Sequence, residues 1–322
     1  MKAEGIGNMK AQLTFLGTGT SQGVPIIGCR CAVCRSLNPK DKRFRSSAFV
    51  RYGGLDILVD AGPDFRMQML RLGISHLDAI LLTHSHRDHT GGLDDVRSLN
   101  YIDRRAAEIY CEERVLDTLR ESYDYVFASH KYPGAPEWNI HTIDENPFFI
   151  EPDDADRELV WVHDRGYCYR NPDGSLSPTD DSKITRAETA ADPDFKGRLM
   201  SSSGRGVEVI PIRGMHDRMP VLGFRFGNIA YITDMSLLPE SEFRKLKGLE
   251  HVTLNTVGYK PHHSHFSLPQ AIETARKIGA RHTWLTHLSH TFPTYPDFCA
   301  ELKTLAPDLD IRPSWDGLVI EG

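Results

Sequence analysis

Short apolar runs that end in polar residues recur along most of the chain, and they predict alternating strands and helices. In the first half we expect strands near 12–16, 48–52, 56–60, 78–83 and 108–111, and helices near 63–72, 92–100 and 112–127. In the second half we expect strands near 207–212, 221–226, 229–233 and 252–255, and helices near 239–247 and 268–278. Two sheets covered by helices form an αββα sandwich. A chain of 322 residues that is 40% hydrophobic can build this core as one domain, 1–322.

The stretch 151–205 departs from this pattern. It is polar, with clusters of Asp and Ser and only short apolar islands. We therefore expect an insertion between two core strands, partly hairpin and partly irregular. It is either a surface loop or a lid or dimer arm, and a dimer arm would make the protein a homodimer. The aromatic residues in or near it are Trp138, Phe148, Phe149, Trp161, Tyr167 and Tyr169.

A histidine-rich segment follows the apolar run 79–82. It has the spacing H-x-H-x-D-H, with His84, His86, Asp88 and His89. A buried strand delivers its last residues into a loop at the sheet edge, where ligands and catalytic groups collect. His84 and His86 can then bind one cation, while Asp88 and His89, around the turn, face a second one.

Segment 80–92 (ILLTHSHRDHTGG) resembles the signature of the metallo-β-lactamase fold hydrolases. Segment 58–62 (LVDAG) resembles the earlier Asp-containing motif of the same family. The resemblance extends over nearly the whole chain. It implies an α/β fold, the four-layer αββα sandwich of the metallo-β-lactamase type, with the polar insertion between core strands.

Further ligands are expected at three later strand ends, in the order that the family requires. The candidates are His216, Asp234 and His287, each after a short apolar run. The resemblance implies that Asp234 bridges two cations. One cation would be held by His84, His86, His216 and Asp234, and the other by Asp88, His89, Asp234 and His287.

A site of nitrogen and oxygen ligands suits Zn, Mn or Fe. Two divalent ions about 3.5 to 4 Å apart can clamp a phosphate, hold a bridging hydroxide as nucleophile and neutralise charge in an in-line displacement. The predicted reaction is therefore hydrolysis. Asp88, as a ligand of the second ion, is counted among the catalytic residues.

Cys29, Cys31 and Cys34 place three thiols within six residues of a chain that has six cysteines. Such a cluster favours a Zn site over disulfides, because an i, i+2 bridge is strained. With segment 17–25 (GTGTSQGVP) ahead of it, the cluster is similar to the branch that contains phosphoribosyl cyclic phosphodiesterase, the PhnP-like proteins. That resemblance implies His290 as the fourth ligand of a structural Zn that holds the loop 29–34. No role is assigned to Cys111, Cys168 and Cys299.

His262, His263 and His265 precede the helix predicted at 268–278, with Ser267 as its N-cap. A histidine there can donate to a phosphate or protonate a leaving alkoxide. In the PhnP-like branch a histidine of this region has that role, and the resemblance favours His265, with His262 as a second phosphate contact. Which of the two is the general acid stays open, as does the alternative of three surface histidines.

The formal net charge is −6 and the pI is near 6.2, which argues against a nucleic-acid surface. Six basic residues surround the cysteine cluster, where they form a solvated loop or a rim for an anionic substrate: Arg30, Arg35, Lys40, Lys42, Arg43 and Arg45. No apolar run approaches the roughly 20 residues that span a bilayer, so no membrane partner is expected. The thiolate cluster and the lack of a targeting pattern at the N-terminus predict the cytoplasm.

These observations favour a metal-dependent phosphodiesterase that opens a cyclic phosphate or cleaves a compact phosphodiester. Its substrate would be a small phosphorylated molecule such as a cyclic phosphate or a nucleotide. Two alternatives stay open. One is a nuclease that resembles the tRNA 3′-processing relatives of this fold, and the other is a non-catalytic metal-binding interaction protein.

Overall fold

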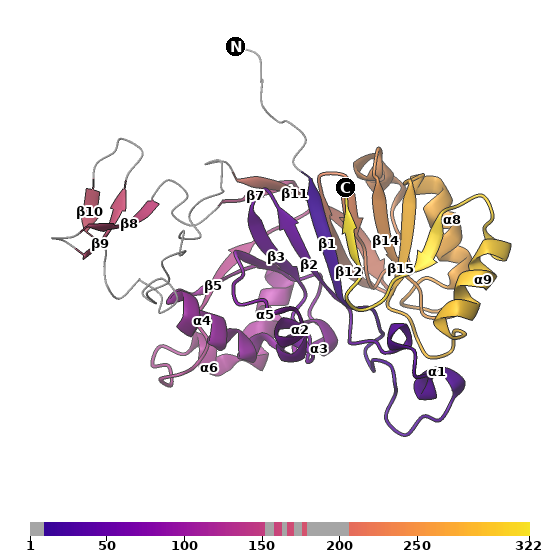
Figure 1. Ribbon diagram of the computed structural model, residues 1–322, viewed down its shortest axis with the longest axis horizontal. Coiled ribbons are helices and arrows are strands. Elements are labelled where there is room, and N and C mark those ends of the chain that lie inside the picture. Colours follow the sequence, from indigo (N-terminus) through magenta and orange to yellow (C-terminus); the bar gives the residue numbers. More distant parts are fainter. Residues whose placement is uncertain (1–9, 152–157, 163–165, 171–175, 179–205) are drawn as a thin grey trace, which may run out of the picture.

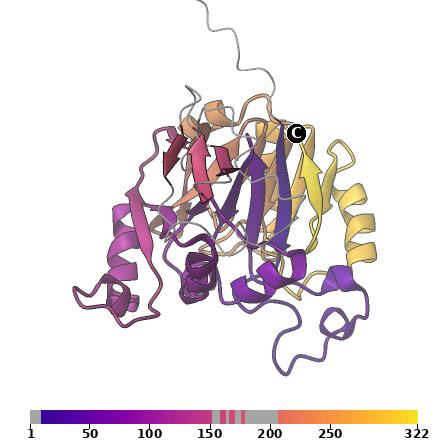
Figure 2. The ribbon, with the colours of Figure 1, turned by 60° about the vertical axis from the view of Figure 1, so that its left-hand side comes forward.

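The computed structural model describes residues 10–151, 158–162, 166–170, 176–178 and 206–322, with backbone alone for the three short segments. Figures 1 and 2 show two sheets packed face to face, with helices on the outer side of each. The predicted αββα sandwich is confirmed.

The first sheet joins an antiparallel half to a parallel half. Strands β17, β1, β2 and β3 pair antiparallel, and β3 to β6 pair parallel. In sheet order the strands are β17 (Val319–Glu321), β1 (Ala11–Gly17), β2 (Ser47–Tyr52), β3 (Leu55–Val59), β4 (Ala79–Leu81), β5 (Ala107–Cys111) and β6 (Trp138–Thr142).

The second sheet also consists of a parallel half and an antiparallel half. Strands β16 to β13 pair parallel, and β13, β12, β11 and β7 pair antiparallel. In sheet order they are β16 (Ile311–Pro313), β15 (His282–Thr286), β14 (His251–Asn255), β13 (Ile229–Tyr231), β12 (Met219–Phe226), β11 (Val207–His216) and β7 (Phe148–Ile150). A separate three-stranded sheet consists of β8 (Glu158–Val162), β9 (Gly166–Arg170) and β10 (Leu176–Pro178).

The helices flank the two sheets. On the first sheet they are α2 (Phe65–Leu72), α3 (Arg87–Thr90), η2 (Leu93–Val96), α4 (Arg97–Asp103), α5 (Glu113–Ser122) and α6 (Asp124–Phe127). On the second they are the 3-10 helix η5 (Glu240–Leu246), α8 (Leu268–Ile278) and α9 (Tyr295–Leu305). The loop after β1 carries α1 (Ala32–Arg35) and η1 (Pro39–Asp41), and Figure 1 shows that it projects from the body of the protein.

Three apolar clusters form the core. The central one lies between the sheets and includes Phe15, Phe224 and Tyr231, all fully buried. A second cluster packs α8 and α9 against the second sheet, and a third packs α2 and α5 against the first. Because β3–β4 and β13–β15 are parallel, their carboxyl ends meet at one edge of the sandwich, where ligands bind in α/β folds.

Several predicted elements differ from the observed ones. The helix expected at 239–247 is the 3-10 helix η5, and the helix expected at 112–127 divides into α5 and α6 at Tyr123. The strand expected at 207–212 continues to His216, because its second half pairs with β12 throughout. Strands β6, β7, β16 and β17 and helix α9 were not among the predicted elements. Three of these strands have only three residues each, which is too short for a clear apolar pattern.

The expected insertion lies between β7 and β11, which are neighbours in the second sheet. Of the segment 151–205 the structure describes the strands β8 to β10, and the side chains of Trp161, Tyr167, Cys168 and Tyr169 lie outside the described residues. Trp138 and Phe148 lie on the core strands β6 and β7 rather than in the insertion.

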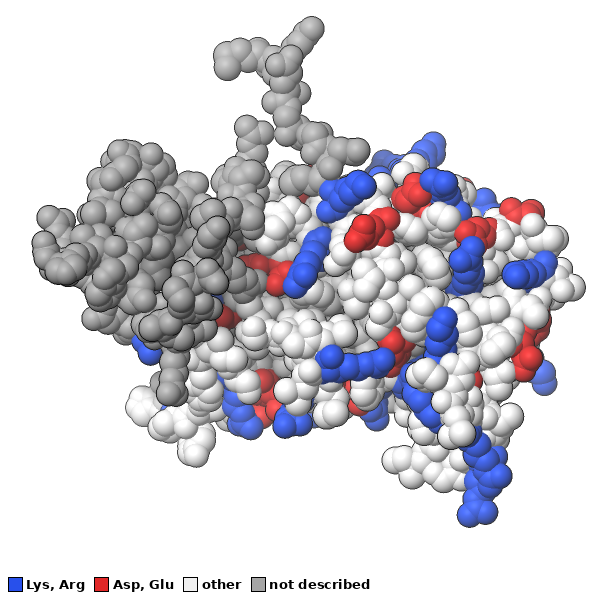
Figure 3. Space-filling model, viewed as in Figure 1, with Lys and Arg blue, Asp and Glu red and all other residues white. Residues whose placement is uncertain are grey.

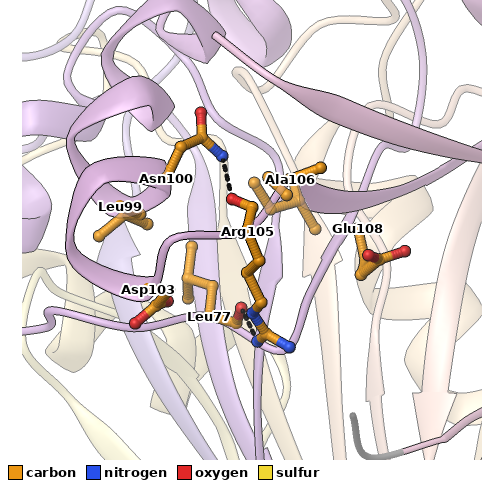
Figure 4. A pocket seen from close by; sticks show the side chains of 9 residues that line it. Leu77, Leu99, Asn100, Asp103, Arg105, Ala106 and Glu108 are labelled. Carbon is orange, nitrogen blue, oxygen red and sulfur yellow. Dashed lines mark hydrogen bonds between the residues drawn. The ribbon is translucent and has the colours of Figure 1, made fainter. Parts of the chain in front are cut away.

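Neither of two surface depressions contains a predicted ligand. A hollow of about 10 Å³ between α4 and β5 has room for at most a water molecule, and Figure 4 shows Arg105 filling its centre. A depression of about 340 Å³ lies between η5 and α8 and is lined by Phe243 and Phe266. Among the described helices, none is both long enough and apolar enough to cross a membrane.

Candidate metal centre

The predicted ligands lie together at the edge where the parallel strands end. Asp234 follows β13, His287 follows β15, and Asp60 follows β3. All three have left-handed backbone conformations, with φ of 58°, 55° and 64°. Such conformations cost of order 1–3 kcal/mol each in non-glycine residues and cluster at functional sites. The unusual backbone conformations at this edge therefore support a functional site there.

Two glycines allow the segment from His84 to His89 to approach the turn after β3. A Cβ on Gly62 would lie 2.0 Å from the carbonyl oxygen of Asp88, and one on Gly92 would lie 2.1 Å from that of Gly62. Two backbone hydrogen bonds of 2.8 Å, from Ala61 N–H to His89 O and from Gly92 N–H to Ala61 O, join the two segments. Only glycine fits at both positions.

Asp234 lies at the centre of the site. Its Oδ1 is 3.0 Å from His287 Nδ1, and its Oδ2 is 3.4 Å from His89 Nε2. Asp88 Oδ2 lies 3.3 Å from the same His89 nitrogen. Three groups that can each surround an ion share Asp234, as the predicted bridging role requires. They are His84, His89 and Asp234; Asp88, Asp234 and His287; and His216, Asp234 and His265.

The hydrogen bonds of His84 and His89 leave one nitrogen of each ring without a hydrogen bond. Thr83 Oγ1 donates to Asp60 and so accepts from His84 Nδ1–H at 2.9 Å. His89 Nδ1–H donates to Asp60 Oδ2 at 2.7 Å. The opposite nitrogens, Nε2 of His84 and of His89, are buried, and no described residue forms a hydrogen bond with them. A buried imidazole nitrogen without a partner is costly, and a divalent ion would satisfy it.

Charge in the site favours cations. Burial alone would lower the pKa of His89, but the carboxylates of Asp234, Asp60 and Asp88 raise it well above its usual value. Burial would raise the pKa of Asp234, yet His287 and His89 hold it well below its usual range. Burial lowers the pKa of His84, which stays neutral. The neutral His84 and the ionised carboxylate of Asp234 are in the forms that coordinate metal, and a cation bound at His89 would replace the proton that these carboxylates favour there.

Asp60 is a functional residue for which sequence reasoning gave only a motif resemblance. Its fully buried carboxylate accepts hydrogen bonds from His89 Nδ1–H, from Thr83 N–H at 2.9 Å and from Thr83 Oγ1–H at 2.9 Å. A carboxylate behind a ligating histidine fixes its tautomer and ring orientation. Ser46, whose Oγ lies 3.1 Å from His287 Nδ1, also contacts the site and was not predicted.

His86 and His216 border the same space. The ring of His86 is 4.7 Å from that of His84 and 4.9 Å from that of His216. His216 Nδ1–H donates to the carbonyl oxygen of Asp234 at 3.0 Å, which leaves its Nε2 free. His86 is the exposed member of the set, so the site opens to solvent beside it.

The histidines ahead of α8 form a row that leads to the site. The ring of His263 stacks on that of His262 at 4.4 Å, and His262 lies 5.3 Å from His265. His265 is 4.7 Å from His287, and its Nδ1 lies 3.9 Å from Asp234 Oδ2. Burial and the neighbouring His287 lower the pKa of His265 to about 2. His265 therefore faces the site, whereas His262 and His263 are exposed.

The start of α8 holds this row in place. Ser267 is the N-cap, as predicted, and its N–H donates to Gln270 Oε1 at 2.9 Å.

The cysteine cluster and His290 also lie together. His290 Nδ1 is 3.2 Å from Cys29 Sγ, 3.5 Å from Cys31 Sγ and 3.7 Å from Cys34 Sγ. Tetrahedral Zn with ordinary bond lengths would separate sulfur and nitrogen ligands by about 3.6 Å. The backbone N–H of Cys34 lowers the pKa of the Cys31 thiol to about 6, whereas burial raises that of Cys34 to about 11. The three thiols are free rather than disulfide-bonded.

Comparison with known families agrees with this geometry. Residues 56–288 match the family profile described as the beta-lactamase superfamily domain. The chain belongs to this superfamily. The metallo-β-lactamase fold implies divalent metal ions in the site, and the described residues include His and Asp groups that could hold them.

A solved structure described as a new diphosphatase from the PhnP family is similar over 98% of both chains, with 32% identity and a TM-score of 0.72. Ribonuclease Z of Streptomyces coelicolor is 30% identical over 280 residues, which are 81% of this chain and 86% of that protein. An octanoyltransferase of Porphyromonas gingivalis is 35% identical over 306 residues, 94% of this chain. The chain spans only 50% of the length of that relative.

Proposed function

We propose that the protein is a dinuclear metal-dependent phosphodiesterase that acts on a small cyclic phosphate or a compact phosphodiester. The observation that carries this proposal is the position of Asp234, which belongs to all three of the active-site residue groups that could each hold an ion. A carboxylate so placed can join two cations at the separation that phosphoryl-transfer sites use. The similarity to a PhnP-family diphosphatase and to ribonuclease Z supports phosphodiester chemistry.

The proposed ligand sets are the predicted ones. We assign His84, His86, His216 and Asp234 to one ion, and Asp88, His89, Asp234 and His287 to the other. All of these residues except His86 belong to groups that could hold an ion, and the ring of His86 lies 4.7 Å from that of His84. Zn, Mn and Fe all suit these donors. When bound, the two ions supply Lewis acidity and lower the pKa of a coordinated water.

The remaining chemistry belongs to the protein's own side chains. Asp60 holds His89 in the tautomer that presents Nε2 to the site. His265, whose buried Nδ1 has no hydrogen-bond partner among the described residues, is our candidate to donate a proton to the leaving oxygen. Because the pKa of His265 is low when the substrate is absent, a phosphate beside it must raise that pKa for this role. His262 would contact the phosphate from the exposed side.

The second proposed site is a structural Zn held by Cys29, Cys31, Cys34 and His290. His290 lies three residues after the metal-site residue His287, and Leu288 N–H donates to Thr18 O at 2.8 Å. A Zn there would fasten the loop after β1 to the segment that carries His287.

A nuclease is the second candidate, favoured by the similarity to ribonuclease Z. On the face drawn in Figure 3, Lys and Arg are interspersed with Asp and Glu rather than gathered into one broad basic surface. The basic side chains of the projecting loop, Arg30 and Arg35, are exposed. A small substrate fits this charge distribution better than a long nucleic acid.

The test is hydrolysis of bis(p-nitrophenyl) phosphate by metal-stripped protein that is refilled with Mn or Zn. Asp88→Ala should abolish turnover and lower the bound metal by about one ion per chain. Turnover that requires both metal and Asp88 would support the proposal. No turnover in fully loaded protein, together with cleavage of a tRNA precursor, would favour the nuclease instead.

A further inference from the structure

Most residues of the candidate metal centre are buried. His84, His89, Asp234 and His287 are at most 2% exposed. By contrast, His86 is exposed and the side chain of Asp88 is 14% exposed. Solvent and substrate therefore reach the centre beside these two residues.

Arg87 lies between them in the sequence, at the first position of α3. Its side chain is exposed, and no carboxylate in the described part of the chain forms an ion pair with it. By contrast, Arg45 pairs with Asp64, and Arg213 pairs with Glu112. Arg87 is thus an exposed cation without an acidic partner among the described residues, and its neighbours in sequence are two residues of a site proposed to bind phosphate.

The guanidinium is held in place by an aromatic ring rather than by an acid. Its central carbon lies 5.5 Å from the centroid of the Tyr123 ring. Tyr123 is 4% exposed, and its hydroxyl donates to the carbonyl oxygen of Thr90 at 2.7 Å. Trp138 packs against the same ring at 5.2 Å. A guanidinium stacked on a fixed ring keeps its donors free and pre-organised for an anion.

Two partly exposed aromatic side chains continue this surface. Tyr125 and Phe127 are each 37% exposed, with ring centroids 6.2 Å from Tyr123 and 5.9 Å from Trp138 respectively. Aromatic faces of this kind pack against flat ring systems such as a nucleobase.

We propose that Arg87 binds the second phosphate of a diphosphate-linked substrate while the first phosphate reacts at the metal centre. This inference rests on the proposed function and names its substrate class. In the reaction the oxygen of water forms a bond to the first phosphorus, and the bond from that phosphorus to the bridging oxygen breaks. The bridging oxygen leaves with the electron pair as part of the second phosphate. Arg87 is then a specificity-determining residue, because its charge balances the charge that develops on this leaving group.

The test compares two substrates in the full-length, Mn-loaded protein. Bis(p-nitrophenyl) phosphate has no second phosphate, and P1,P2-di(adenosine-5′) diphosphate has one. Arg87→Ala should lower kcat/KM for the diphosphate about 30-fold, and that for the monophosphate diester less than about 3-fold, because a hydrogen bond between charged groups is lost only in the former. Arg87→Lys should recover part of the loss but not all of it.

Controls separate this role from folding and from the proposed function itself. Arg120→Ala removes an exposed arginine on α5 that pairs with Glu113 and Asp117, and it should affect both substrates equally. Equal losses for both substrates in Arg87→Ala would overturn the inference while leaving the phosphodiesterase intact.

Binding gives a readout that does not need turnover. The affinity for α,β-methylene-ADP, measured by calorimetry, should fall at least about 10-fold in Arg87→Ala. An unchanged affinity would also overturn the inference. If the wild type hydrolyses neither substrate, the proposed function fails, and this binding measurement still decides the role of Arg87.

Discussion

Replacing Asp60 with Asn tests whether the buried carboxylate behind His89 controls the metal centre. The change keeps the size of the side chain, and Asn tolerates the left-handed conformation that Asp60 adopts at φ 64°. Backbone strain and packing therefore stay nearly the same. What changes is one charge and one acceptor, because the Asn amide can accept from Thr83 but its NH₂ group cannot accept from His89.

The magnitude follows from the lost contact. A hydrogen bond to a charged group contributes about 1.5–3 kcal/mol, and the Asp60–His89 bond of 2.7 Å is fully buried. Removing a carboxylate behind a metal-bound histidine typically lowers metal affinity about 10–100-fold, which is about 1.4–2.7 kcal/mol. The two estimates agree, so we expect the loss to appear in metal affinity.

The assay is competition with a chelator of known affinity, followed by elemental analysis of the retained metal. The matched control is Asp308→Asn, an exposed carboxylate that pairs with Arg276 at 2.8 Å and should not change metal affinity. If Asp60→Asn binds both ions within about 3-fold of wild type, Asp60 does not orient His89 as we argue.

Three further predictions follow from local geometry. Cys34→Ser should remove about one Zn per chain without loss of the other metals, as measured by elemental analysis; unchanged Zn content would contradict the four-ligand site. Gly62→Ala should lower the free energy of unfolding by about 1–3 kcal/mol in urea titrations, because its Cβ would lie 2.0 Å from Asp88 O, and an unchanged midpoint would contradict the close approach. Burial would lower the pKa of His76, but hydrogen bonds to the carboxylates of Asp103 and Asp78 raise it. Its charged form therefore contributes stability below pH about 6.5 that is lost as pH rises through the folded pKa. His76→Gln should remove about 1 kcal/mol of this pH dependence, and parallel wild-type and variant profiles would disprove it.

Two groups of the predicted site residues belong to short patterns that can be recognised locally. His84, His86, Asp88 and His89 lie within six positions, and Cys29, Cys31 and Cys34 do the same. The assignment of His216, Asp234, His287 and His290 depended on the family resemblance, because no short local pattern marks any of them as a ligand. The strands before His216, Asp234 and His287 could be predicted from the residues themselves, because a buried strand has an unbroken apolar pattern.

The contacts that complete the site required the folded chain. Ser46 reaches His287 across 241 positions, and Asp60 reaches His89 across 29, so no local pattern relates either pair. Arg87 was visible inside the histidine motif, yet its lack of an acidic partner and its stacking on Tyr123 depend on how α5 and α6 pack. Whether a charged side chain has a partner depends on the residues around it. The residue that contacts Arg87, Tyr123, lies more than 30 positions away in sequence. The ligand pattern of the sequence therefore predicts a metal site, whereas the choice of substrate depends on residues that only the packing of the chain brings together.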